Sequence, residues 1–332
     1  MTGRERIRAL MRGERADRTA FWLGNPHEST WPLLHTHFKT RQSEEIRRIL
    51  NDDLRWINAS TAYRHPENVG MFKGADPGRA FGEDADARRI EEYEWPDLGL
   101  LDFSDVLQEL NAAGDAFRAS GFWCPFFHDL ADLFGMETYF FLMITRPDVV
   151  HDVTRRVVDF YLEANRRLFR TAGDRIDAFF MGNDFGTQLD LLVGPKQMEE
   201  FVFPYLKVLI QQAHECGLPV ILHSCGAIHR IIPRLLDLGI DALYPLQAKA
   251  NLMDAQTLSS SFKGRLLFIG GIDTQDLLVR ATPDQVKAEV RRVRRLLGPR
   301  LVISPSHEAL LPNVPPQNIE AMAEAAQEPD QE

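Results

Sequence analysis

The sequence predicts a single-domain (β/α)8 TIM barrel of the α/β class over residues 1–326, with an irregular insertion after strand 2. Short apolar runs rich in β-branched and aromatic residues alternate with segments of helical periodicity, as in parallel α/β folds. The first strand leads into Gly24-Asn-Pro-His27, which lacks the glycine-rich turn of an open dinucleotide-binding sheet. Polar groups follow nearly every strand, as expected where strand ends converge on one active site.

The elements were placed in chain order from periodicity and turn residues. Strands are expected at residues 19–24, 54–59, 121–127, 178–181, 220–222, 242–244, 266–269 and 301–303. Helices are expected at residues 7–11, 43–50, 105–118, 130–144, 149–171, 195–216, 228–238, 283–297 and 316–326. Residues 60–120 are rich in Gly, Pro, Asp and Arg, which indicates a functional loop or a small subdomain. The acidic tail 327–332 is expected to be disordered.

Composition restricts the class of protein. The hydrophobic fraction of 44% and charged fraction of 26% are typical of a globular domain with a full core. A formal net charge of -10 argues against nucleic-acid binding. No apolar stretch is long enough to span a membrane, and the first residues are too charged for a secretory signal. Three cysteines make no disulfide framework, so a reducing, cytoplasmic location is expected.

The side chains that follow the predicted strands are the candidate site residues. Asp184 is expected to handle protons or orient a cationic group, with a loop cap as the alternative, and Glu308 is a second catalytic candidate. Contacts to a small-molecule substrate are expected from the polar residues Asn25, His27, His128, Asp129, Asn183, Gln188, Gln247 and Asp273.

His223 and Cys225 form the most informative pair. They follow the fifth strand two residues apart, so both side chains point to the same side and offer one ion a nitrogen and a sulfur, ligands that suit zinc. Paired Cys-x-x-Cys ligands of a structural zinc site are absent, whereas a catalytic site needs three ligands and an open position. The third ligand is expected from His307 or Glu308 after the eighth strand. A small buried Cys beside a structural His is the alternative interpretation.

Several of these segments together resemble the uroporphyrinogen decarboxylase superfamily. The segments are Met181–Gln188, Gly194-Pro195, Phe203–Lys207, His223–Gly226, Gly239–Gln247, Gly270–Asp273 and Ser306-His307 through Pro315–Ile319, with Arg4–Ile7 and Ala16–Arg18 near the start. The resemblance covers essentially the whole chain. It implies a (β/α)8 barrel with the site at the carboxyl ends of the strands.

The resemblance implies two chemistries. Metal-free decarboxylases of the superfamily hold substrate carboxylates with N-terminal arginines, and the corresponding turn, Leu23–Thr30, contains none. A second branch, the cobalamin-dependent methyltransferases, uses zinc held by His-x-Cys and a later Cys. His223 and Cys225 match the first two positions, while Ser306, His307 and Glu308 stand near the third.

Three hypotheses follow. The first is a zinc-dependent methyltransferase or demethylase that works with a corrinoid (cobalamin) protein and a thiol or similar acceptor. The second is a metal-free decarboxylase or lyase of a small carboxylated or tetrapyrrole-like substrate. The third is a non-catalytic barrel that binds a ligand or a corrinoid partner.

Overall fold

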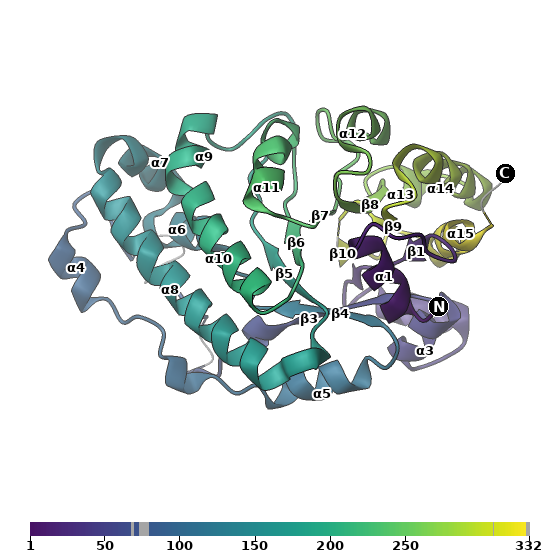
Figure 1. Cartoon of the computed structure of the whole chain (residues 1–332), viewed down its shortest axis with the longest axis horizontal. Coiled ribbons are helices and arrows are strands. Elements are labelled where there is room, and N and C mark those ends of the chain that lie inside the picture. The colour runs from purple at the N-terminus through teal and green to yellow at the C-terminus, as the bar shows by residue number, and fades with distance from the viewer. Residues whose placement is uncertain (68–69, 73–79, 308, 330–332) are drawn as a thin grey trace.

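A computed structural model describes residues 1–67, 70–72, 80–307 and 309–329. Eight parallel strands form a nearly closed barrel in the order β1-β9-β8-β7-β6-β5-β4-β3, which confirms the predicted TIM barrel (Figure 1). The barrel strands are β1 (Ala20–Phe21), β3 (Leu54–Asn58), β4 (Phe117–Gly121), β5 (Ala178–Gly182), β6 (Val220–His223), β7 (Ala242–Tyr244), β8 (Leu267–Ile272) and β9 (Leu301–Pro305). A second, two-stranded sheet pairs β2 (Asn25–Pro26) with β10 (Ala309–Leu310).

Helices surround the sheet (Figure 1). They are α1 (Gly3–Met11), α2 (Trp31–Phe38), α3 (Ser43–Ile49), α4 (Ala87–Glu92), α5 (Ser104–Ala112), α6 (Phe126–Phe134), α7 (Met136–Thr145), α8 (Pro147–Ala172), α9 (Pro195–Phe201), α10 (Phe203–Glu215), α11 (Ile232–Leu238), α12 (Ala255–Phe262), α13 (Leu277–Arg280), α14 (Pro283–Leu297) and α15 (Pro316–Gln327). Within the described ranges, none of these helices combines the length and the apolar character that crossing a membrane requires.

Aromatic rings fill the inside of the barrel. Trp22 packs on Tyr244 with ring centroids 4.8 Å apart, and Phe180 contacts both rings at 6.0 and 5.8 Å. All three side chains are at most 1% exposed. Because these rings come from β5, β7 and the residue that directly follows β1, the interior is a packed core, and any site must lie above it at the ends of the strands.

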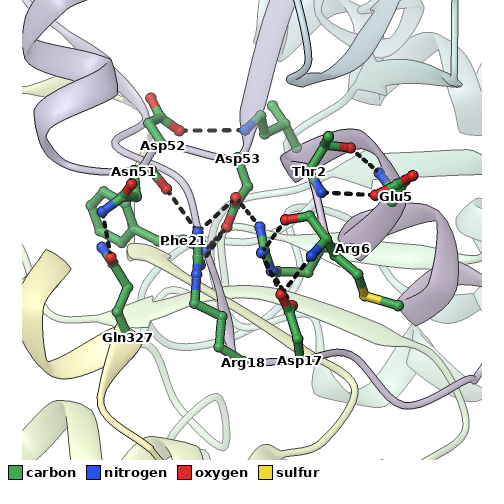
Figure 2. A network of polar contacts seen from close by, with 12 residues as sticks. Thr2, Glu5, Arg6, Asp17, Arg18, Phe21, Asn51, Asp52, Asp53 and Gln327 are labelled. Atoms are coloured by element: carbon green, nitrogen blue, oxygen red, sulfur yellow. Dashed lines mark hydrogen bonds and ion pairs between the residues drawn. The ribbon is translucent and has the colours of Figure 1, made fainter.

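The barrel closes through a side chain between β1 and β3. These strands end the sheet order and share no ladder. Asp53, just before β3, bridges them: its backbone N–H donates to Phe21 O at 2.8 Å, and its carboxylate accepts from Phe21 N–H at 2.9 Å. Arg6 and Arg18 donate to the same buried carboxylate (Figure 2). Charge-assisted bonds thus replace a missing stretch of ladder.

The third strand was predicted wrongly. Residues 121–127 were expected to form it, but β4 ends at Gly121 and α6 begins at Phe126. The apolar run misled the prediction because it spans the strand end, a turn with Cys124 at φ 53° and the first turn of a helix. The adjoining helix predicted at 130–144 is two helices, α6 and α7, because Gly135 adopts φ 80°.

The C-terminal segment contacts the rest of the chain where the structure describes it. Helix α15 includes Gln327, whose amide donates to Leu50 O at 2.8 Å. The next residue, Glu328, forms an ion pair with Arg291 at 2.6 Å. The sequence predicts a disordered tail at residues 327–332, of which residues 330–332 lie outside the described residues.

Candidate active site

Asp184, His223 and Cys225 meet at the carboxyl ends of β5 and β6. His223 Nε2 lies 3.2 Å from Asp184 Oδ1 and 3.4 Å from Cys225 Sγ. One nitrogen, one sulfur and one carboxylate oxygen from these residues all lie within 4.8 Å of one another. The pair predicted from His-x-Cys is therefore joined by a carboxylate 39 residues before His223 that we had expected to act separately.

Parallel pairing of β5 with β6 explains this convergence. Gly182 is the register partner of His223, so the residues that follow both strands leave the sheet side by side. The Cys225 N–H donates to Asp184 Oδ1 at 2.8 Å, and the Gly226 N–H donates to Gln247 Oε1 at 2.6 Å. These bonds tie the turn after β6 to the turns after β5 and β7 and fix where the thiol lies.

Gly226 is required by the geometry of this turn. Its φ is +88°, a conformation that side chains other than glycine rarely adopt. A Cβ at this position would lie 2.2 Å from Gly186 O, inside van der Waals contact with backbone. The close approach of the two turns is what brings Asp184 to Cys225.

The Asp184 carboxylate is stabilised as an anion. Burial raises its pKa, but the His223 ring and the Cys225 N–H outweigh burial and lower the pKa to about 2. A carboxylate with so low a pKa is a weak base near neutral pH, so proton abstraction is not its natural chemistry. Its charge suits it to hold a cation, whether a metal ion or an imidazolium.

Aromatic residues position the His223 ring. Trp123 and Tyr244 pack edge-on against it, with centroids at 4.9 and 5.4 Å. Trp56 in turn packs on Trp123 at 4.8 Å. Gly182 makes room for this arrangement, since a Cβ there would lie 2.0 Å from the Trp123 ring. Sequence reasoning did not identify these three aromatic residues, although Trp56 and Trp123 lie inside predicted strands and Tyr244 ends one.

Two of the predicted substrate contacts lie beside the group. His128 Nε2 is 3.1 Å from the Asp184 backbone oxygen, and Gln247 holds the turn that carries Cys225. His128 is half-buried. It comes from the first turn of α6, and not from a turn directly after a strand, because β4 ends earlier than predicted.

Three other predicted contacts have structural roles in the described chain. Asn183 is 1% exposed, and its amide donates to Cys124 O and accepts from Phe127 N–H. Asp273 accepts from three backbone N–H groups at the start of α13. Asp129 accepts from Tyr161 on α8, behind the barrel. The substrate contacts expected from these three residues are not supported by this placement.

The remaining predicted residues lie on loops around the strand ends. Asn25, in β2, pairs with Ala309, whose N–H donates to His307 Nδ1. His27 and Gln188 are exposed. Among the described residues, His307 does not belong to the group that could hold a metal, so its expected role as the third ligand stays a prediction, with Glu308 as the alternative. Glu308 lies outside the described residues.

Comparison with known proteins agrees with the fold and the motifs. Residues 87–329 match the family model for uroporphyrinogen decarboxylase (URO-D). No curated protein sequence matches the chain. Among solved structures, a methyltransferase from Methanosarcina mazei superposes with a TM-score of 0.69 at 16% sequence identity, over 98% of both chains. The family model spans well over half of this chain and the whole site, so the chain belongs to the uroporphyrinogen decarboxylase family.

Proposed function

We propose that this protein is a zinc-dependent methyltransferase that transfers a methyl group between a corrinoid carried by a partner protein and a small-molecule thiol. The observation that carries the proposal is the convergence of Asp184, His223 and Cys225 at the strand ends of the barrel. The methyltransferase from Methanosarcina mazei shares the fold along its whole length, which supports methyl transfer as the reaction class.

The donor set fits zinc. Tetrahedral zinc with bonds of about 2.0–2.3 Å places neighbouring ligand atoms about 3.5 Å apart. The two measured separations from His223 Nε2, 3.2 and 3.4 Å, are close to this value. Three protein ligands leave the fourth position for a substrate, as in catalytic zinc sites. In this proposal Asp184 is the third ligand, in place of the His307 or Glu308 expected from the sequence.

Each residue has a separable role. Cys225 and His223 supply the soft sulfur and nitrogen ligands, and Asp184 supplies a negative charge that offsets the charge of the ion. Zinc bound there lowers the pKa of a coordinating thiol and keeps it as a thiolate. Gln247 and Trp123 act through the ligands: the first holds the Cys225 turn, and the second orients the His223 ring.

Metal content tests the proposal. Protein purified without chelator and with zinc supplied should contain about one zinc per chain, and Cys225→Ala should contain almost none. Asp184→Asn should lower zinc affinity at least about tenfold. Cys216→Ala is the matched control, because Cys216 is an exposed free thiol on the end of α10. Wild type should then demethylate methylcobalamin in the presence of 2-mercaptoethanol, and Cys225→Ala should not.

A metal-free decarboxylase or lyase is the second candidate. The contact between His223 Nε2 and Asp184 Oδ1 favours it, since a histidine–carboxylate pair is complete without an ion. In that case neither wild type nor Cys225→Ala would hold zinc, and chelator would leave activity intact. That result would refute the methyltransferase proposal.

A further inference from the structure

A basic cavity lies at the amino-terminal end of the barrel. It measures about 330 Å³ and is lined by Arg15, Ala16, Arg18, Thr19, Arg291, Arg294, Arg295, Gly298, Pro299, Glu328 and Pro329. Thr19 precedes β1 and Pro299 precedes β9, whereas Cys225 follows β6. Because the strands are parallel, the cavity and the zinc-type site are at opposite ends of the barrel, and one does not depend on the other.

Among the described residues, five guanidinium groups and one carboxylate line this cavity, in a chain whose net charge is -10. The guanidinium groups differ in the hydrogen-bond acceptors that they contact. Arg18 donates to the buried Asp53 (Figure 2). Arg294 donates to Thr19 Oγ1 and to the backbone oxygens of Ala325 and Glu328. These two arginines are anchored as part of the wall.

Arg15 and Arg295 differ from these two anchored arginines. Both are exposed, and neither guanidinium contacts an acceptor in the part of the chain that the structure describes. They come from segments about 280 residues apart, before β1 and at the end of α14, which Figure 1 shows side by side next to α15. Two unpaired cations held at one cavity repel each other, and an anion between them would remove that repulsion.

The Glu328 carboxylate shows how an anion is held in this cavity. Glu328 receives two parallel bonds of 2.6 Å from Arg291, the geometry with which arginine binds carboxylate and phosphate. This pair is only partly covered, with side chains 40% and 33% exposed. A partly exposed ion pair is weak, so a more highly charged anion can displace the carboxylate.

The cavity lining also defines the ligand. Arginine forks match phosphate oxygens, and several arginines around one cavity match a group with more than one phosphate. No aromatic residue is among the described residues that line the cavity, so these residues offer no stacking surface for a base. The volume is that of a small-molecule site. Nucleic acid is disfavoured, since the surrounding chain is acidic and the arginines are confined to a cavity.

We infer that this cavity is a binding site for a small diphosphate-bearing anion, which Arg15, Arg291 and Arg295 hold and for which Glu328 is the built-in competitor. Bound anion replaces the Glu328 carboxylate on Arg291 and bridges to the two unpaired guanidinium groups.

Calorimetric titration of the full chain with sodium pyrophosphate, at constant ionic strength, tests the inference. Wild type should bind one pyrophosphate per chain. The double variant Arg15→Gln/Arg295→Gln should bind at least about tenfold more weakly, because each charge-assisted bond contributes about a factor of ten. Glu328→Gln should bind about three- to tenfold more tightly. Arg41→Gln/Arg170→Gln, which removes two exposed arginines outside the cavity, is the matched control and should bind like wild type.

Three further results decide the details. Cys225→Ala should bind pyrophosphate like wild type, which separates this site from any metal site. Orthophosphate should bind at least about tenfold more weakly than pyrophosphate, and ADP about equally, if the diphosphate alone is recognised. The inference would be overturned if wild type showed no saturable binding of pyrophosphate. It would also be overturned if both double variants bound pyrophosphate equally weakly while their thermal melts matched wild type. Weaker binding by Glu328→Gln would overturn the competitor role.

Discussion

Replacing Asp53 by Asn tests the idea that a side chain closes the barrel between β1 and β3. The carboxylate is 3% exposed and accepts from Arg6 at 2.6 Å, from Arg18 at 2.8 and 2.9 Å, and from the Phe21 N–H at 2.9 Å. An amide of the same shape keeps one acceptor but removes the negative charge and turns an amino group toward the arginines (Figure 2).

The expected loss of stability depends on the hydrogen bonds and hydration that Arg6 and Arg18 retain. Removing one partner of a buried ion pair costs about 3–5 kcal/mol. Arg6 keeps two bonds to Asp17, and the Arg18 side chain is 19% exposed and can be partly hydrated. The cost should therefore lie at the lower end, about 3 kcal/mol, against a total stability of about 5–15 kcal/mol. For a chain of 332 residues the melting temperature should fall by about 4 °C.

Thermal and urea unfolding of Asp53→Asn measure this cost, with Asp17→Asn as the matched control. Asp17 also pairs with Arg6, but its side chain is 42% exposed, so its loss should cost at most about 1 kcal/mol. A loss in Asp53→Asn no larger than in Asp17→Asn would refute the reasoning. Closure would then rest on packing of the barrel interior.

Three further predictions concern the site and its surroundings. Gly226→Ala should lower zinc content at least about tenfold, because the added Cβ would lie 2.2 Å from backbone. Gly217 also has a positive φ, +72°, but no neighbour within 4 Å, so Gly217→Ala should cost about 1 kcal/mol of stability and leave zinc content unchanged. Metal analysis measures the zinc content of both variants, and unfolding measures their stability. Burial raises the pKa of Asp129 to about 8, so the native carboxyl keeps a proton that the unfolded chain releases above about pH 4. Stability should therefore fall as pH rises between about 4 and 8, and Asp129→Asn should flatten that decline in the melting temperature; an unchanged profile would exclude Asp129 as its source. Asn183→Ala leaves the buried Phe127 N–H without its acceptor, whereas Cys124 O still accepts from the Phe126 N–H, so the change should cost about 1–3 kcal/mol with zinc binding retained in the folded fraction. Loss of zinc from fully folded protein would contradict a purely structural role.

The sequence was sufficient where the signal is local. Alternation of apolar strands with amphipathic helices predicted the barrel, and the spacing of His223 and Cys225 predicted that both face the same side. These inferences need only neighbouring residues, because strand and helix periods relate each side chain to the next. The third strand failed for the same reason: residues 121–127 are apolar throughout, and a continuous apolar run does not distinguish a strand from a turn and a helix.

Only the tertiary structure decided which distant residues meet. Asp184 joined the predicted ligands because Gly182 and His223 share a register in parallel strands, a relation set by backbone pairing between β5 and β6. Asp53 closed the barrel through contacts with Arg6, Arg18 and Phe21, and Arg15 came to line the same cavity as Arg295, which follows it by 280 residues. Periodicity reports which face of an element is buried. It carries no information on which loops that burial brings together, because that depends on the packing of the whole barrel.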